Sequence, residues 1–137
     1  MKYLAMVIID RDSEEARNYE KGTPPDPKFM EAMGRHVEEI TRRGALVATA
    51  GLHPLANGAR VRVAGGKMTV TDGPFIESKE IVGGYAILEA KSKEEAVELG
   101  RAFMGLHLEV LGASYQGTLE VRQMFDPSDA PCGVSKS

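Results

Sequence analysis

The stretch TDGPFIESKE, residues 71–80, gathers several side chains that could do chemistry. Asp72, Glu77 and Glu80 carry carboxylates, and Lys79 carries an amine. A carboxylate at the end of a sheet strand can act as a general acid, a general base or a hydrogen-bond acceptor when it faces a pocket. We therefore predict that Asp72, Glu77 and Lys79 form a catalytic group and that Glu80 contributes to ligand binding.

The same stretch also has a purely structural interpretation. Asp72-Gly73-Pro74 has the composition of a turn, in which Asp hydrogen-bonds to nearby backbone and Gly supplies a positive φ. The charged residues that follow would then form a solvated loop, whose ion pairs contribute little to stability. Under the site hypothesis, Asp72 and Glu77 point into a common cavity near a dimer interface, with at least one histidine or arginine within reach.

Three histidines and one arginine are further candidates for ligand binding. His36 lies on the apolar stripe of a predicted helix, where a hydrogen-bonded core or interface histidine is the alternative. His53 precedes Pro54 in a loop and is either a turn residue or a group that reaches the same pocket. His107 follows the second long predicted helix. Arg122 is either an anion partner or an ordinary arginine on a sheet surface.

Other kinds of site have no support in the sequence. No two histidines have the spacing of metal ligands, and the one cysteine, Cys132, cannot complete a zinc site. The sequence has no phosphate-binding loop, dinucleotide fingerprint or nucleophile elbow. We therefore predict no metal and no cofactor, and an unknown small molecule as the ligand.

Charge and hydropathy narrow the class of protein further. The net charge is −3, from 17 basic and 20 acidic residues, and no basic block occurs, so direct contact with nucleic acid is not expected. The apolar run from Leu4 to Ile9 is too short for a signal peptide or a membrane span. These features predict a cytoplasmic protein that does not bind membranes.

The predicted elements follow the order strand, helix, strand, hairpin, strand, helix, strand. A helical turn at residues 14–19 interrupts the first long connection. Asp26 and Pro27 begin the first long helix, and Ser92 with Glu95 forms a capping box for the second. The strands are expected at residues 3–9, 45–52, 81–90 and 118–125, the long helices at 27–43 and 93–104, and the hairpin around Gly65-Gly66.

The register of this hairpin follows from the alternation of its side chains. With Gly65-Gly66 as a two-residue turn, Val63 faces Met68 and Val61 faces Val70. Arg62 and Arg60 then face threonines. All apolar partners share one face, which we expect to be buried.

This order of elements predicts an α+β ferredoxin-like sandwich with an extra β-hairpin. Residues 1–126 form the single domain, and residues 127–137 form a flexible tail. Two helices cover only one face of the sheet, so the other face needs a cover. A second copy of the chain is the simplest cover, and we therefore expect a homodimer.

The segment TDGPFIESKEIVGGYAIL, residues 71–88, resembles the motif that names the DGPF group of YCII-related proteins. RRGALVATAGLHP, RVRVAGGK and LEVRQMF match as well, so the resemblance extends from about residue 32 to residue 125. It implies a dimeric α+β barrel in which two ferredoxin-like sheets pack face to face.

The resemblance implies no single activity. Some YCII-related proteins carry a His–Asp pair at a pocket, but His36 lies later on its helix than that histidine. Other DGPF members occur beside, or fused to, sigma factors of the extracytoplasmic-function type. Two hypotheses follow: an enzyme that uses acid–base chemistry from the motif, or a non-catalytic ligand-binding or regulatory module with a protein partner in transcription.

Overall fold

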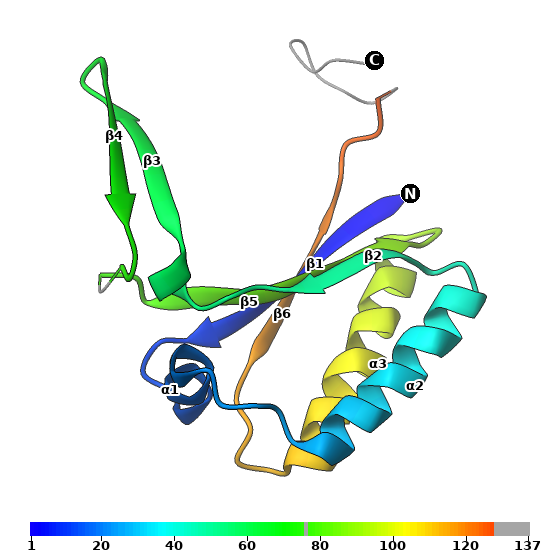
Figure 1. Ribbon diagram of the computed structural model, residues 1–137. Coiled ribbons are helices and arrows are strands. Elements are labelled where there is room, and N and C mark those ends of the chain that lie inside the picture. Colours follow the sequence, from blue (N-terminus) through cyan, green and yellow to red (C-terminus); the bar gives the residue numbers. More distant parts are fainter. Residues whose placement is uncertain (76, 128–137) are drawn as a thin grey trace.

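The computed structural model describes residues 1–75 and 77–127 (Figure 1). Its strands are β1 (Lys2–Asp10), β2 (Leu46–Gly51), β3 (Ala59–Ala64), β4 (Lys67–Asp72), β5 (Glu80–Glu89) and β6 (Thr118–Gln123). Its helices are α1 (Glu14–Lys21), α2 (Pro27–Arg42) and α3 (Lys93–Leu111), with a 3-10 turn at Leu55–Asn57.

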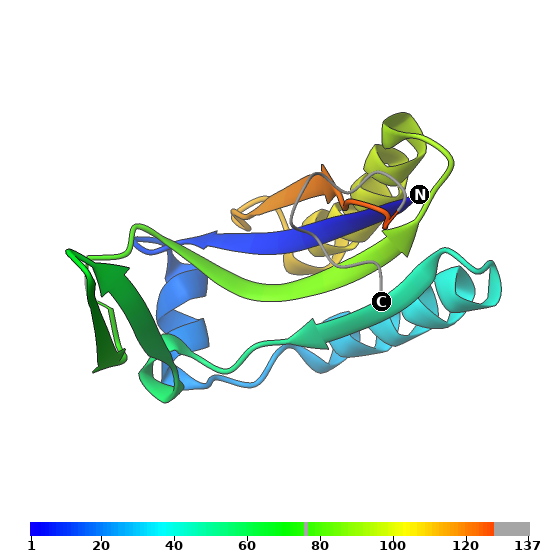
Figure 2. The same ribbon diagram turned by 90° about the horizontal axis from the view of Figure 1, so that it is seen from above.

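Four strands form one antiparallel sheet in the order β2-β5-β1-β6, and β3 pairs only with β4. All three α-helices lie on the same side of the four-stranded sheet, whereas the hairpin β3–β4 rises on the other side (Figure 1). Seen from above, the hairpin stands at the end of the sheet away from the N-terminus (Figure 2). The predicted ferredoxin-like sandwich with an extra hairpin is confirmed.

The helix starts follow local sequence signals. Asp26 caps α2 by accepting a hydrogen bond of 2.7 Å from the Lys28 N–H, next to Pro27 at the first helical position. Ser92 Oγ caps α3 by accepting from the Glu95 N–H at 3.1 Å. However, α3 continues to Leu111, beyond the predicted end near residue 104, so His107 lies within the helix and not after it.

The core lies between the sheet and the two long helices. Ala5 and Leu88 from the sheet pack with Ile40 of α2 and Leu99 of α3. Gly100 allows α3 to approach β6 closely, because a Cβ at this position would lie 2.9 Å from the Leu119 side chain. The remaining buried members are Tyr3, Ala45, Ala90 and Ala96.

The hairpin has the predicted register but not the predicted burial. Val61 pairs with Val70 and Val63 pairs with Met68, as the alternation of side chains indicated. The expectation that Val61 and Val63 are buried is wrong for the single chain, where they are 65% and 69% exposed. The reason is that no described helix or strand of the same chain packs over this face of the hairpin.

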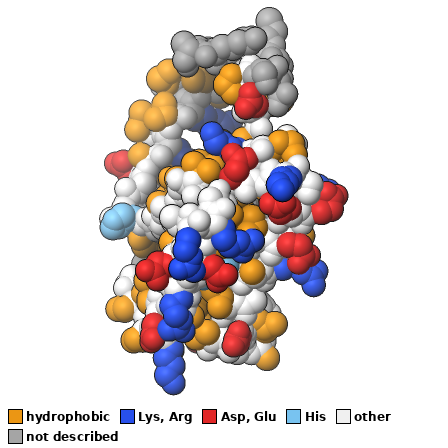
Figure 3. All heavy atoms as spheres, turned by 90° about the vertical axis from the view of Figure 1, so that its right-hand side faces the viewer, with side chains coloured by type: hydrophobic (Ala, Val, Ile, Leu, Met, Phe, Trp, Pro, Cys, Tyr) orange, Lys and Arg blue, Asp and Glu red, His pale blue; other side chains and the backbone are white. Residues whose placement is uncertain are grey.

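The remaining features of the fold concern the C-terminal residues, membrane spans and the charge of the surface. Cys132 and the predicted tail from residue 128 onward lie outside the described residues. Within residues 1–75 and 77–127, no helix has the length and apolar character required to cross a membrane. Lys/Arg and Asp/Glu side chains are interspersed over the face shown in Figure 3 and do not form a patch of one sign there.

Candidate functional site

A cleft of about 970 Å³ opens between the end of β1, the start of β5 and the segment that joins α3 to β6. Three separate parts of the chain therefore form its walls. Its lining residues are Ile8, Asp10, Asp12, Lys79, Glu80, Met104, Leu108, Tyr115, Gln116, Gly117 and Thr118. The cleft is large enough for a small organic ligand, since ligand pockets usually measure about 300–1,000 Å³.

The polar side of the cleft is mainly acidic. Asp10 and Glu80 are paired residues on the adjacent strands β1 and β5, which brings their side chains to the same end of the sheet. Asp10 Oδ1 accepts a hydrogen bond of 2.9 Å from the Asp12 N–H, so the turn after β1 keeps the second aspartate nearby. Lys79 adds one positive charge, and all four charged residues are exposed to solvent. Three carboxylates and one ammonium give this side a net negative charge.

The opposite side of the cleft is apolar and aromatic. Met104 and Leu108 come from α3, and Tyr115 comes from the segment that follows the helix. Burial, and secondarily the charge of Glu15, raises the pKa of the Tyr115 hydroxyl above its usual value. The phenol therefore stays protonated at neutral pH and can donate a hydrogen bond to a ligand.

His107 lies behind this wall among three aromatic rings. Its ring centroid is 4.7 Å from that of Phe29, 4.7 Å from that of Phe103 and 4.9 Å from that of Tyr115. The Phe103 carbonyl accepts a hydrogen bond of 3.0 Å from His107 Nδ1, which places the proton on this nitrogen. Burial lowers the pKa of His107 below its usual value. His107 thus supports Tyr115 from behind and does not itself line the cleft.

The lowered pKa of His107 predicts a pH dependence of stability. Unfolded histidine titrates near 6.5, so at mildly acidic pH the unfolded chain binds more protons than the folded chain. The free energy of unfolding should therefore fall as the pH decreases from about 7.5 to about 5, as measured by urea denaturation. His107→Gln should reduce this fall. Equal pH dependence of the wild type and this variant would contradict the assignment to His107.

The DGPF motif forms the connection between the hairpin and β5. The Gly73 N–H donates a hydrogen bond of 2.8 Å to the Gly58 carbonyl, which closes the base of the hairpin. A Cβ at Gly73 would lie 1.8 Å from the Leu55 carbonyl oxygen, so this approach requires glycine. The Gly73-Pro74 peptide bond is cis. Phe75 is buried, and the Arg60 guanidinium lies 3.9 Å from the centroid of its ring.

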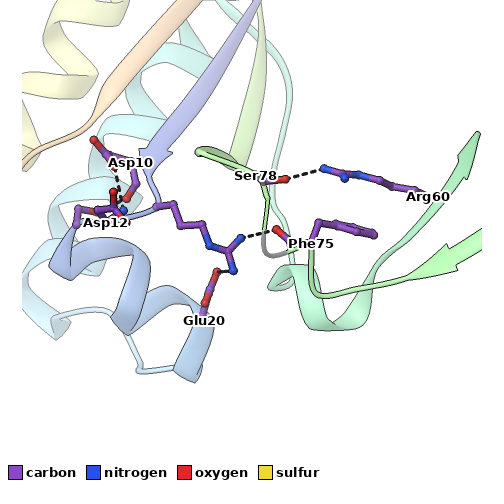
Figure 4. Close-up of polar contacts among 8 residues, drawn as sticks. Asp10, Asp12, Glu20, Arg60, Phe75 and Ser78 are labelled. Atoms are coloured by element: carbon purple, nitrogen blue, oxygen red, sulfur yellow. Dashed lines mark hydrogen bonds and ion pairs between the residues drawn. The ribbon is translucent and has the colours of Figure 1, made fainter.

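Two arginines fix the residues after Phe75 (Figure 4). Arg60 of β3 donates to Ser78 Oγ at 2.6 Å and pairs with the Glu77 carboxylate. Arg11 Nη1 donates to the Phe75 carbonyl at 2.6 Å, and the Arg11 N–H donates to the Lys79 carbonyl at 2.9 Å. This network holds the backbone that presents Lys79 and Glu80 to the cleft. The main effect of the motif in the single chain is thus to position its last two residues.

Only some of the predicted site residues of the motif line the cleft. Lys79 and Glu80 line the cleft, whereas Asp72 and Glu77 do not, so the expectation that these two carboxylates meet in a common cavity is not met by the cleft of the single chain. Asp72 is exposed at the end of β4. A hydrogen bond from its own backbone N–H, and then the Arg60 guanidinium, lower the pKa of the exposed Glu77. The Arg60 guanidinium is therefore within reach of Glu77, outside the cleft.

The other predicted ligand-binding residues lie away from the cleft. His36 is half-buried beside a small cavity of about 130 Å³ between α2 and α3, and its pKa is lowered mainly by burial. His53 is exposed, and its carbonyl accepts a hydrogen bond of 2.8 Å from the Tyr19 hydroxyl. Arg122 is exposed and lies 3.9 Å from Glu120. Among the described residues, no three His, Cys, Asp or Glu side chains come together as metal ligands.

Sequence reasoning missed Asp10, Asp12 and Tyr115 as members of the candidate site. A signal for the first two was present, because the charged triplet Asp10-Arg11-Asp12 comes directly after the apolar run of the first strand. Side chains at strand ends often form sites, since the sheet holds them rigidly beside flexible loops. Tyr115 had no such signal in the sequence.

Comparison with known protein families matches residues 1–103 to the YCII-related domain. The chain belongs to the YCII-related family. An uncharacterised protein of Rhizobium meliloti (strain 1021) is 27% identical to this YCII-related protein over 133 residues, which cover 96% of the present chain and 99% of the relative. The domain match contains Asp10, Asp12, Lys79 and Glu80 and ends just before Met104, so it spans the polar side of the cleft and does not reach the apolar side formed by Met104, Leu108 and Tyr115.

Proposed function

We propose that this YCII-related protein binds a small organic molecule in the cleft between β1, β5 and the segment after α3. The observation that carries the proposal is the combination of an apolar aromatic wall with charged groups at two paired strand ends. In sites for small molecules, fixed polar groups orient the ligand while its apolar portion packs against an apolar wall.

The charges in the cleft favour a particular class of ligand. Asp10, Asp12 and Glu80 outnumber Lys79, so a cationic group is attracted and an anionic group is repelled. Met104, Leu108 and Tyr115 provide a surface for an apolar or aromatic portion. The proposed ligand is therefore an amine with an apolar substituent.

A second candidate function is acid–base catalysis in the same cleft. Glu80 or Asp10 would accept a proton, and the protonated Tyr115 phenol would donate a hydrogen bond to a developing negative charge. Lys79 is the one member of the predicted catalytic group that lines the cleft. However, the carboxylates here are exposed, and catalytic carboxylates are usually desolvated. The geometry therefore favours binding without catalysis over the enzyme hypothesis.

Nuclear magnetic resonance titration of the isotope-labelled protein tests the binding proposal. Phenethylamine should shift the backbone amides of Gly117 and Thr118 saturably, and 3-phenylpropionate should bind at least about tenfold more weakly because of its charge. The variant with Asp10→Asn and Glu80→Gln should lose this preference. Glu38→Gln, an exposed carboxylate of α2 outside the cleft, should retain it. If neither probe causes saturable shifts of the amides in the cleft, the proposal is refuted.

Gly117→Ala provides an independent variant for the same titration. A Cβ at this position would lie 2.2 Å from the Tyr115 hydroxyl oxygen, so the tyrosine side chain must move away. Because the obstructing atom is the end of a side chain, the fold should tolerate the change. Phenethylamine affinity should fall while the melting temperature stays near that of the wild type. If the compound is also converted during incubation, and Lys79→Gln abolishes the conversion, the acid–base candidate gains support.

The proposed assembly is a homodimer. Leu4 pairs with Ile87 and Met6 pairs with Tyr85 on the face of the sheet opposite the core residues Ala5 and Leu88. No helix of the described residues lies on this side (Figure 1), so this open sheet face is available to a second copy. A regulatory role with a protein partner in transcription remains the alternative for a non-catalytic module.

A further inference from the structure

We propose that the hairpin β3–β4 is an arm whose apolar face packs against a second copy of the chain. This inference goes beyond ligand binding, since none of the residues of the arm lines the cleft. It assigns a role to the most exposed apolar surface of the described residues, formed by Val61, Val63, Met68 and Val70.

The arm has a regular apolar face that is not buried within the single chain. The two cross-strand pairs Val61–Val70 and Val63–Met68 place four apolar side chains side by side on one face. Each of these side chains is at least 65% exposed. Scattered apolar residues are normal on a protein surface, whereas a contiguous apolar group on a regular element marks an interaction site.

The arm has little support within its own chain. A two-stranded hairpin alone in water is at best marginally stable. β3 and β4 pair with no strand of the four-stranded sheet, and the arm is anchored at its base by Gly73 and Arg60. Packing against another surface would stabilise the part that extends from this base.

The position of the arm favours a second copy of the chain as the occupant of its apolar face. The arm rises on the side of the sheet that lacks helices, next to the open sheet face (Figure 1). A copy that covers Leu4, Met6, Tyr85 and Ile87 is thereby placed beside the arm, and twofold symmetry makes the contact reciprocal. Each chain then covers both apolar surfaces of the other.

Charge complementarity points to the same occupant. The arm carries Arg60, Arg62 and Lys67 against the single acidic residue Asp72, whereas the whole chain has a net charge of −3. Three basic residues and one acidic residue give the arm a net charge of +2, so the rest of the chain has a net charge of −5. Opposite net charges favour contact of the arm with the rest of a second copy over contact between two arms.

Sedimentation velocity of the full chain tests this role. The wild type should sediment as a dimer of 14.8 kDa chains at micromolar concentration. The double variant Val61→Thr with Val70→Thr keeps β-branched side chains in the strands but removes apolar surface, so its dimer dissociation constant should rise at least about tenfold. The control Thr69→Ser with Thr71→Ser, on the opposite face of the arm, leaves the charge of the arm unchanged and should change this constant less than about twofold.

Two outcomes of this experiment would contradict a role of the arm in dimerisation. A monomeric wild type would overturn the proposal and leave a different protein as the occupant. A dimer that the threonine variant does not weaken would also overturn it, while keeping the open sheet face as the interface. Val63→Thr with Met68→Thr, on the neighbouring pair, repeats the test if the first variant fails to fold. Phenethylamine binding in the cleft is a separate measurement, so failure of the arm and failure of the proposed function are distinguishable.

Discussion

Gly73→Ala is expected to lower the free energy of unfolding by about 3 kcal/mol, near the upper end of the cost of overpacking. The added Cβ would lie 1.8 Å from the Leu55 carbonyl oxygen and 3.3 Å from the Gly58 carbonyl oxygen. Both obstructing groups are backbone atoms, so relief requires the chain to move. Urea denaturation followed by circular dichroism measures the effect.

Gly34→Ala is the matched control for this substitution. Gly34 lies within α2, and a Cβ at this position would meet no atom within 4 Å. Alanine should therefore stabilise the protein by about 0.5–1 kcal/mol through its higher helix propensity. Similar small effects of both substitutions would show that the close approach at Gly73 does not exist in solution.

Phe75→Ala is expected to lower the free energy of unfolding by about 3 kcal/mol, as is usual for removal of a buried phenylalanine. Phe75 is 6% exposed, and its loss also removes the surface on which the Arg60 guanidinium lies. The same variant should weaken phenethylamine binding, because the Arg60 guanidinium, which also donates to Ser78 Oγ, would lose the ring on which it lies and would hold the backbone before Lys79 less firmly.

The control for Phe75 is another phenylalanine of the same chain. Phe125 is 70% exposed, so Phe125→Ala should change the free energy of unfolding by less than about 0.5 kcal/mol. Stability loss at Phe75 combined with unchanged probe affinity would mean that the motif contributes to folding only. That result would leave the cleft proposal intact but remove the positioning role of the motif.

Local features of the fold were predictable because their causes are local. The helix starts were predicted from the capping residues Asp26-Pro27 and Ser92 with Glu95. The register of the hairpin was predicted from the alternation of apolar and polar side chains around Gly65-Gly66. The end of α3 was less predictable. Residues 105–111 have no proline to stop the helix, and Gly112 at φ 90° supplies the actual termination.

The candidate site was only partly predictable because it depends on tertiary contacts. Lys79 and Glu80 were identified from the motif, but nothing in the sequence relates them to Tyr115. The role of Arg60 also depends on the path of the chain, which returns Phe75 and Ser78 to the base of β3. The exposure of Val61 and Val63 could not be predicted from the alternation of side chains. Alternation shows that these side chains share a face of the hairpin, but it does not show whether anything covers that face.

The cleft walls come from the beginning, the middle and the last quarter of the described chain, which has a consequence for folding kinetics. No fragment shorter than residues 8–118 contains all the lining residues of the cleft, so a ligand recognises the state in which β1, β5 and β6 are already assembled. Contacts between residues so distant in sequence form late, because closing long loops costs conformational entropy. A ligand of the cleft should therefore lower the rate of unfolding and lengthen the lifetime of the native state, while the rate of folding stays nearly constant.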